Sequence, residues 1–169
     1  MERTTPLWVS MCRASMREIP SAPDRLIVSG DFRGFSPEEL FAHWVEPELL
    51  VKWWPQIAKV EPGVGGEYRF SWQDTALYGT YTAFEVGTHL GFTWAWTSNP
   101  NDCQPLQVDI WFMEVDGGTR MAVYHGPYCD AEDDRTARDG HREGWIHFGM
   151  RLAGLRTPDG AAAPPSTEE

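Results

Sequence analysis

The sequence has little of what stabilises small secreted proteins, crosses membranes or binds nucleic acid. Its three cysteines, Cys12, Cys103 and Cys129, are widely separated and form no CxxC pair, so we expect reduced thiols and no disulfide framework. No apolar run approaches the length of a membrane span, which predicts no transmembrane segment. The 14 Lys and Arg residues are outnumbered by 25 Asp and Glu residues, for a net charge of -11. Nucleic acid is therefore not an expected partner, because phosphate binding needs clustered basic side chains.

Sequence motifs of nucleotide-binding and hydrolytic enzymes are also missing. No serine lies in a GxSxG pattern, and the sequence contains neither GxGxxG nor a Walker loop. The glycine-rich segment PGVGG at 62–66 lies between two predicted strands, so it lacks the helix N-terminus on which phosphate loops depend. His125, Cys129 and His141 match no standard spacing of zinc ligands. We therefore expect neither a cofactor nor a metal ion.

The length and the two ends of the chain indicate how it is organised. A chain of 169 residues is long enough for one domain with a core of its own. Residues 1–23 contain several prolines and no periodicity, which predicts an extended or disordered arm before a domain over 24–156. Residues 157–169 have the composition of a disordered tail. The apolar segment 7–12 is shorter than that of a secretory signal, so we expect no export signal and a cytoplasmic protein.

Residues 36–55, SPEELFAHWVEPELLVKWWP, predict two short helices that follow the first strand. Ser36 suits the N-cap of the first helix, and Pro47 begins the second. Helices this short are not stable alone, so the pair must lie on a larger apolar surface. We expect it to close one end of a sheet, with Trp53 and Trp54 packed beneath or beside the C-terminal helix.

Runs of alternating apolar and polar residues, bounded by turn signals, predict about six or seven strands that are mostly antiparallel. The clearest turn signal is Asp-Gly-Gly at 116–118, between two such runs. The alternation also indicates that one face of the sheet is covered by another element. The predicted strands are 25–33, 56–61, 67–73, 77–86, 89–97, 107–115 and 119–125.

The C-terminal part of the chain predicts the element that covers this sheet. From His141 to Leu155, apolar residues recur at spacings of three and four, which is typical of the apolar stripe of a helix. We therefore expect an amphipathic helix over 141–155, laid across the sheet in an α+β fold. The acidic, glycine-bounded segment 126–140 before it predicts a surface loop.

One strand, two short helices, a run of strands and a C-terminal helix form a distinctive order. It is carried by the segments SPEELFAHWVEPELLVKWWP, GGEYRF, HLGFTWAW, DGGTRMAVYHGP and HREGWIHFGMRL, which span most of 25–155. In this order the chain resembles the START-like helix-grip (SRPBCC) superfamily and, within it, the family of the C-terminal domain of the heat-shock protein 90 ATPase activator. PGVGG departs from the tighter paired glycine of such relatives, which lengthens one turn.

The resemblance implies a helix-grip fold, in which a curved antiparallel sheet wraps around a long C-terminal helix. It also implies an internal cavity between sheet and helix for small hydrophobic ligands. From the residues alone two outcomes stay open, because bulky rings on the inner face either leave a pocket or fill the core. The residues expected to line the ligand site are Phe70, Trp72, Tyr78, Trp94, Trp96, Ile110, Phe112, Met121, Val123, His125, His141, Trp145 and Phe148.

Two histidines are the candidate catalytic residues. His125 ends an alternating strand on the predicted inner face, and His141 lies one helical turn before Trp145. Either imidazole could bond to a ligand carbonyl or hydroxyl, or move a proton near neutral pH. The alternative for each is a structural histidine bonded to the backbone.

Three functions stay open at this point. The first is binding of a small hydrophobic or aromatic molecule, such as a lipid or a polyketide, inside the cavity. The second, which the superfamily also includes, is a polyketide cyclase or aromatase that uses a cavity histidine as acid or base. The third, implied by the activator family, is a co-chaperone that binds a chaperone, and a homodimer is a further possibility for the partner.

Overall fold

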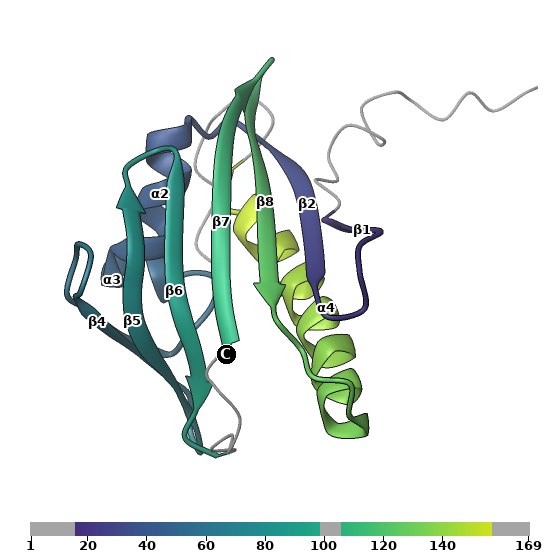
Figure 1. Ribbon diagram of the computed structural model, residues 1–169. Coiled ribbons are helices and arrows are strands. Elements are labelled where there is room, and N and C mark those ends of the chain that lie inside the picture. The colour runs from purple at the N-terminus through teal and green to yellow at the C-terminus, as the bar shows by residue number, and fades with distance from the viewer. Residues whose placement is uncertain (1–15, 99–105, 157–169) are drawn as a thin grey trace, which may run out of the picture.

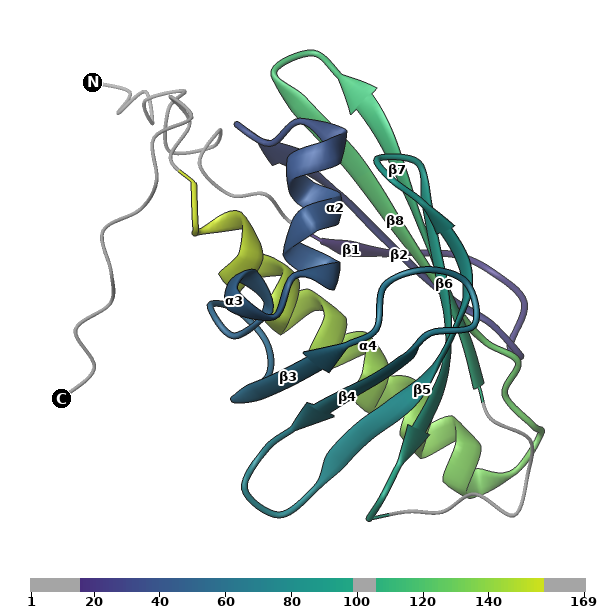
Figure 2. The same ribbon diagram turned by 90° about the vertical axis from the view of Figure 1, so that its left-hand side faces the viewer.

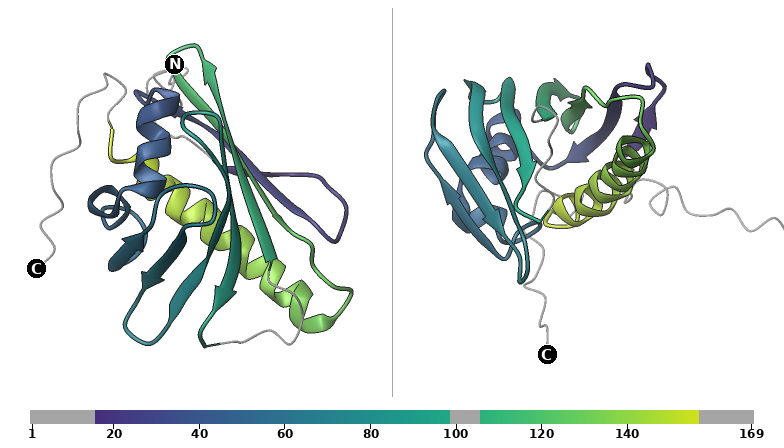
Figure 3. Two further views of the ribbon diagram at one scale, coloured as in Figure 1. Left: turned by 60° about the vertical axis from the view of Figure 1, so that its left-hand side comes forward. Right: turned by 60° about the horizontal axis from the view of Figure 1, so that its bottom comes forward.

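An eight-stranded antiparallel sheet curves around helices in the computed structural model, which describes residues 16–98 and 106–156 (Figures 1 and 2). The helices lie on the same, inner face of this sheet (Figures 2 and 3). The elements are β1 (Arg17–Ile19), β2 (Leu26–Arg33), α2 (Pro37–Val45), α3 (Pro47–Leu50), β3 (Ile57–Val60), β4 (Glu67–Ser71), β5 (Ala76–Glu85), β6 (His89–Trp96), β7 (Leu106–Val115), β8 (Gly118–Gly126) and α4 (Glu132–Ala153). Their order in the sheet is β1-β2-β8-β7-β6-β5-β4-β3.

The predicted α+β class and antiparallel sheet are confirmed, but the described sheet has eight strands and not six or seven. The additional strand is β1, which lies in the segment expected to be an arm and pairs with the free edge of β2. Glu18 in β1 also accepts hydrogen bonds from Arg138 at 2.8 Å and from Arg142 at 3.5 Å, both on α4. Three residues are too few to show a period of two, so the sequence pattern could not reveal this strand.

Two local signals in the sequence produce the expected structure. Ser36 and Glu39 form a capping box, in which Ser36 Oγ accepts the Glu39 N–H at 3.2 Å and Glu39 Oε2 accepts the Ser36 N–H at 3.1 Å. Between β7 and β8, Gly117 has a φ of 80° and closes a tight hairpin. A positive φ is accessible to glycine at little cost, which explains why Asp-Gly is such a strong turn signal.

Helix α4 has 22 residues and begins at Glu132, nine residues before the predicted start at His141. The prediction of a surface loop over 126–140 is therefore wrong from Glu132 onward. The first turns of α4 are polar, so they show no apolar stripe, yet their three acidic residues favour the positive end of the helix dipole. Arg138 also anchors this part by donating to the Arg25 carbonyl at 2.9 Å.

The core lies between the sheet and the three helices and is rich in aromatic rings. Trp44, Trp53 and Trp54 from the α2–α3 region are buried in it, and Trp54 contacts Trp145 of α4 with ring centroids 5.4 Å apart. The expected role of the helix pair as the closure of one end of the sheet is consistent with this packing. Within the described residues, no helix is long and apolar enough to cross a membrane. Residues 1–15, 99–105 and 157–169, with Cys12, Cys103, the segment 7–12 and the expected tail, lie outside the described residues.

Candidate functional site

The structure places all predicted lining residues except Tyr78 in the core or against it. Tyr78 is 41% exposed, and its neighbour Leu77 is fully buried. Successive side chains of a strand point to opposite faces, so Tyr78 lies on the outer face and cannot line an interior site. That prediction is corrected.

The remaining residues do not form one site but fall into two groups, one under α2 and in the middle of the sheet and the other beside α4. Phe112 and Met121 pack under α2, where Phe41 contacts Phe112 at 5.5 Å and Trp44 Nε1 lies 3.2 Å from Met121 Sδ. Ile110 and Val123 are paired on neighbouring strands and fill the middle of the sheet. The two candidate histidines and Trp94, by contrast, lie together beside α4. This second group contains two of the three buried polar atoms that have no partner among the described residues.

We call this second group the histidine cluster, which consists of Trp94, His125, Tyr128, His141 and Trp145. The rings of His125 and His141 are stacked, with centroids 4.4 Å apart and planes at 14°. Trp94 packs against both histidines, at 4.7 Å and 5.3 Å between ring centroids. The cluster joins three elements, since Trp94 comes from β6, His125 from β8, and His141 and Trp145 from successive turns of α4. Tyr128 lies in the connection between β8 and α4.

Hydrogen bonds within the cluster fix the protonation of His125. Trp145 Nε1 lies 3.1 Å from His125 Nδ1. An indole N–H is only a donor, so His125 Nδ1 must accept, and the ring proton of the neutral imidazole is on Nε2. Tyr128 Oη and His141 Nδ1 form a second hydrogen bond of 2.8 Å.

Three buried side-chain polar atoms have no hydrogen-bond partner among residues 16–98 and 106–156, namely Tyr81 Oη, Trp94 Nε1 and His125 Nε2. Two of them belong to the histidine cluster and are donors on neighbouring rings. Leaving a buried donor unpaired costs roughly 1–3 kcal/mol, and native proteins do so rarely. The pair of donors is therefore the most unusual polar feature of the interior.

The cluster is neutral near physiological pH. Burial, and to a lesser degree the nearby His141, hold the pKa of His125 well below its ordinary value. Burial lowers the pKa of His141 to about 4. Burial likewise raises the pKa of the Tyr128 hydroxyl. Each group is therefore in its uncharged form in the folded protein.

Aromatic rings surround the cluster on its other sides. Trp54 stacks near Trp94, with ring centroids 6.0 Å apart and planes at 21°. Trp72, Trp96 and Phe148 lie farther out and are only partly buried. These three rings form the side of the site that is nearest to solvent.

Several residues of the interior were not among the predicted lining residues, and four of them show which signals were missing or overlooked. Trp44 and Trp54 belong to the helix pair, whose twin tryptophans predicted packing but not participation in a site. Tyr128 lies in the segment predicted as a loop, so its buried hydroxyl had no signal in the sequence. Tyr81 shares the buried face of β5 with Leu77, and strand parity within β5 could have indicated it.

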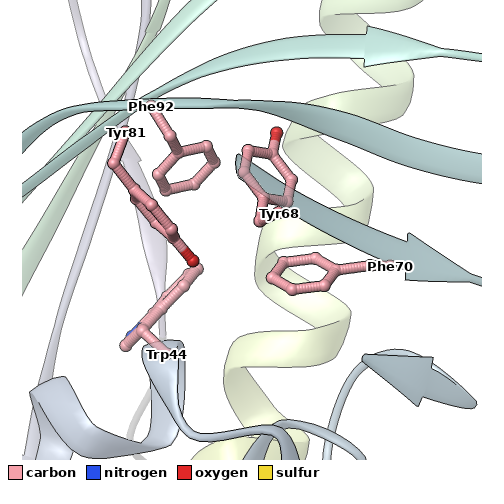
Figure 4. Close-up of a pocket in the computed structure, with 5 residues that line it drawn as sticks. All are labelled: Trp44, Tyr68, Phe70, Tyr81 and Phe92. Atoms are coloured by element: carbon pink, nitrogen blue, oxygen red, sulfur yellow. The ribbon is translucent and has the colours of Figure 1, made fainter. Parts of the chain in front are cut away.

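A narrow gap between sheet and helices is lined by Trp44, Tyr68, Phe70, Tyr81 and Phe92 (Figure 4). It is too narrow at every point to hold a water molecule. The hydroxyl of Tyr81 is directed toward Trp44 (Figure 4). None of its lining residues belongs to the histidine cluster, so this gap is separate from the cluster.

The side chains of the described residues offer no metal site. Within the part of the chain that the structure describes, no group of three or more His, Cys, Asp or Glu side chains is arranged to hold a metal ion. Cys129 is exposed, whereas His125 is buried.

Comparison with known protein families gives one match. The family model described as Activator of Hsp90 ATPase homolog 1-like protein matches residues 35–156. No curated protein matches the sequence.

Several solved structures share the fold. Protein Ms6760 from Mycobacterium smegmatis is 24% identical, has a TM-score of 0.66, and the match covers 84% of this chain and 97% of that protein. The Aha1 dimer from Colwellia psychrerythraea is 16% identical at a TM-score of 0.66, over 78% of this chain and 94% of the other. DynU16, a protein of the dynemicin biosynthetic locus, is 17% identical at a TM-score of 0.65, over 79% of this chain and 46% of the other. At these identities the likeness concerns the fold, which by itself does not determine function.

Proposed function

The chain belongs to the family of Activator of Hsp90 ATPase homolog 1-like proteins, and on that premise we propose that it binds a small hydrophobic or aromatic molecule between its sheet and α4. The observation that carries the proposal is the pair of unpartnered donors, Trp94 Nε1 and His125 Nε2, in an otherwise aromatic interior. A binding site for a small molecule is typically mostly apolar, with a few polar groups that fix orientation. The histidine cluster has this composition.

Entry of the ligand requires rings to move. Trp72, Trp96 and Phe148 are partly exposed and lie at the edge of the core, so they are the side chains that can move with the least loss of packing. A ligand in their place would restore the lost apolar contacts and supply partners for the donors. Binding would thus be accompanied by a change in the environment of several tryptophans.

The test is a panel of small aromatic and aliphatic compounds, screened by thermal unfolding and by tryptophan fluorescence. A compound present at about one hundred times its dissociation constant stabilises the folded protein by about 2.7 kcal/mol. For a chain of this size, that corresponds to a rise of roughly 5–10 °C in the midpoint of thermal unfolding. The proposal is abandoned if no compound raises the midpoint or changes the fluorescence.

A matched pair of variants locates the binding. Trp94→Phe keeps a ring in the cluster but removes one donor, whereas Trp111→Phe alters a ring that is 45% exposed on the outer face. We expect Trp94→Phe to weaken binding of the active compound and Trp111→Phe to leave it unchanged. Equal effects of the two variants would place the ligand elsewhere.

Acid–base catalysis on a bound molecule is the second candidate. It is favoured by the hydrogen bond between Tyr128 Oη and His141 Nδ1, which couples an imidazole to a hydroxyl next to the proposed ligand. His125 is not the base, because Trp145 occupies its lone pair at Nδ1. The test is exchange of the α-protons of a bound ketone with deuterated solvent, followed by NMR, which His141→Phe should abolish.

Two further expectations concern partners and stay predictions. The family name refers to activation of a chaperone ATPase, and one structural relative is described as a dimer. Calorimetry with heat-shock protein 90 would test a chaperone partner, and light scattering would test a homodimer. A cytoplasmic location also stays a prediction.

A further inference from the structure

The two unpartnered donors of the histidine cluster restrict the chemistry of the ligand. We infer that the ligand, if the proposed function is right, is a flat aromatic molecule with a neutral oxygen acceptor, such as the carbonyl of an aromatic ketone or quinone. Trp94 Nε1 and His125 Nε2 donate to this oxygen. The inference goes beyond general apolar binding because it names the one polar group that the ligand must carry.

Both unpartnered atoms can only donate. The indole of Trp94 has no lone pair to offer at Nε1. His125 would be free to accept at Nε2 in its other neutral tautomer, but the Trp145 N–H at 3.1 Å occupies Nδ1 and keeps the proton on Nε2. A ligand must therefore bring lone pairs, as an oxygen acceptor does, and one whose polar groups are only N–H donors leaves the site unsatisfied.

The two donors are on rings that are in direct contact. The rings of Trp94 and His125 are in edge contact, with centroids 4.7 Å apart and planes at 65°. Both nitrogen atoms are shielded from solvent. A carbonyl oxygen has two lone pairs, so it can accept from both nitrogens at once.

The acceptor is neutral because the cluster offers no positive charge. The nearest basic side chains on α4, Arg138 and Arg142, are directed to Glu18 of β1. Burying an isolated carboxylate among these rings would be costly without such a partner. A carbonyl satisfies the two donors without this penalty.

The flat aromatic character follows from the rings around the donors. Trp54 and Trp94 have nearly parallel planes, and Trp145 lies 5.4 Å from the centroids of both. A planar molecule can stack on the face of such rings, whereas a bulky aliphatic one cannot.

The experiment compares three probes that share one tricyclic skeleton. Fluorenone carries a carbonyl, fluorene lacks it, and fluorene carboxylate carries an anion in its place. Dissociation constants are measured with the full chain by quenching of tryptophan fluorescence at neutral pH. We expect fluorenone to bind at least about tenfold more tightly than fluorene, because fluorene leaves both donors unpaired, and we expect the carboxylate to bind more weakly than fluorenone.

Variants and spectroscopy assign the preference to the named atoms. In Trp94→Phe the preference for fluorenone over fluorene should fall several-fold, and in Trp111→Phe it should persist. In the wild type, the carbonyl stretch of bound fluorenone should move to lower frequency, and the ¹⁵N signals of Trp94 Nε1 and His125 Nε2 should shift. These two readouts need no variant, so they hold even if Trp94→Phe fails to fold.

The outcomes separate the inference from the proposed function. Equal binding of fluorene and fluorenone would overturn the inference while leaving an apolar binding site intact, and tightest binding of the carboxylate would overturn it in favour of an anion site. An undiminished preference in folded Trp94→Phe would overturn the role of the donors. If none of the three probes binds, the inference fails, whereas the proposed function is decided by the wider panel of compounds.

Discussion

Two contacts between a histidine and a tryptophan lie on opposite faces of the same sheet, and they differ in how their polar atoms are satisfied. On the outer face, His89 stacks on Trp111 with ring centroids 3.8 Å apart, and His89 Nε2 bonds to Asp109 Oδ1 at 2.7 Å. On the inner face, His125 packs edge-on to Trp94, and His125 Nε2 has no partner among the described residues. In the folded protein the outer histidine therefore has a hydrogen-bond partner for its Nε2, whereas the inner histidine has none among the described residues.

This difference indicates where function is to be sought. The outer pair is within reach of water, so any unmet hydrogen bond there costs little. His125 is only 2% exposed, so water cannot bond to its unpaired Nε2–H. This group therefore destabilises the folded protein until a ligand accepts a hydrogen bond from it. A residue arrangement that is unfavourable in the empty protein and favourable with a ligand is what a binding site requires.

The largest expected effect is on protein stability, and it compares the removal of an interior ring with the removal of a ring on the outer face. Trp53 is buried, and its Nε1 donates to the His43 carbonyl at 2.9 Å. Trp53→Ala should lower the free energy of unfolding by about 3–5 kcal/mol, and Trp111→Ala by less than about 1 kcal/mol. Urea denaturation measures both. A loss below about 1 kcal/mol in Trp53→Ala would mean that the ring is not part of the core.

The second prediction concerns pH and the inner histidines. The folded-state pKa of His141 is lowered from 6.5 to about 4. As pH falls through this range, the unfolded chain takes up a proton that the folded chain does not, so stability decreases, by up to about 3 kcal/mol at about 1.4 kcal/mol for each pH unit. Below about 4 both states are protonated, and this loss is complete.

The variant His141→Asn tests the assignment. Asparagine does not titrate and has a polar atom near the position of Nδ1, so it can still bond to Tyr128. Its free energy of unfolding should decrease less than that of the wild type between pH 6.5 and about 4. Because His125 and His43 also have lowered pKa values, only the difference between the two curves is attributed to His141. If the free energy of unfolding fell equally with pH in the wild type and in the variant, the burial of His141 would be contradicted.

Much of the fold could be predicted because its signals are local. The capping box at Ser36, the Asp-Gly turn before β8 and the alternation along β6 and β7 each depend on residues close in sequence. The elements that were not predicted from the sequence depend on contacts with residues that are distant in the chain. Strand β1 is held by the edge of β2 and by Glu18 bonding to α4, and the first turns of α4 by Arg138 bonding to the Arg25 carbonyl.

The candidate site could be predicted in part of its membership but not in its chemistry. Periodicity indicated that His125, His141 and Trp145 face the interior, and they lie together. It could not indicate that Trp145 donates to His125 and thereby fixes its tautomer, since that depends on the rotation of α4 relative to β8. Whether the rings fill the core or leave a cavity is likewise decided by fractions of an ångström in packing.

The third prediction removes the bond that keeps His125 a donor. Trp145→Phe retains the ring but leaves His125 Nδ1 without its donor, which should lower the free energy of unfolding by about 1–2 kcal/mol. The more specific readout is the ¹⁵N spectrum of His125. In the wild type the proton should be on Nε2, and in Trp145→Phe the tautomer with the proton on Nδ1 should appear. A spectrum unchanged by the variant would mean that Trp145 does not set the tautomer.

The smallest changes in the free energy of unfolding are expected at two tyrosines of the inner face, and the two changes should differ in sign. Tyr68 Oη donates to the Thr93 carbonyl at 2.5 Å, so Tyr68→Phe should lower the free energy of unfolding by about 1 kcal/mol. Tyr81 Oη is buried without a partner among the described residues, so Tyr81→Phe should leave the free energy unchanged or raise it by up to about 1 kcal/mol. Both changes remove the same oxygen atom from a buried ring, so their opposite signs in urea denaturation would isolate the cost of an unmet hydrogen bond. A clear loss of stability in Tyr81→Phe would show that its hydroxyl is satisfied in solution, and it would weaken the same reasoning for Trp94 and His125.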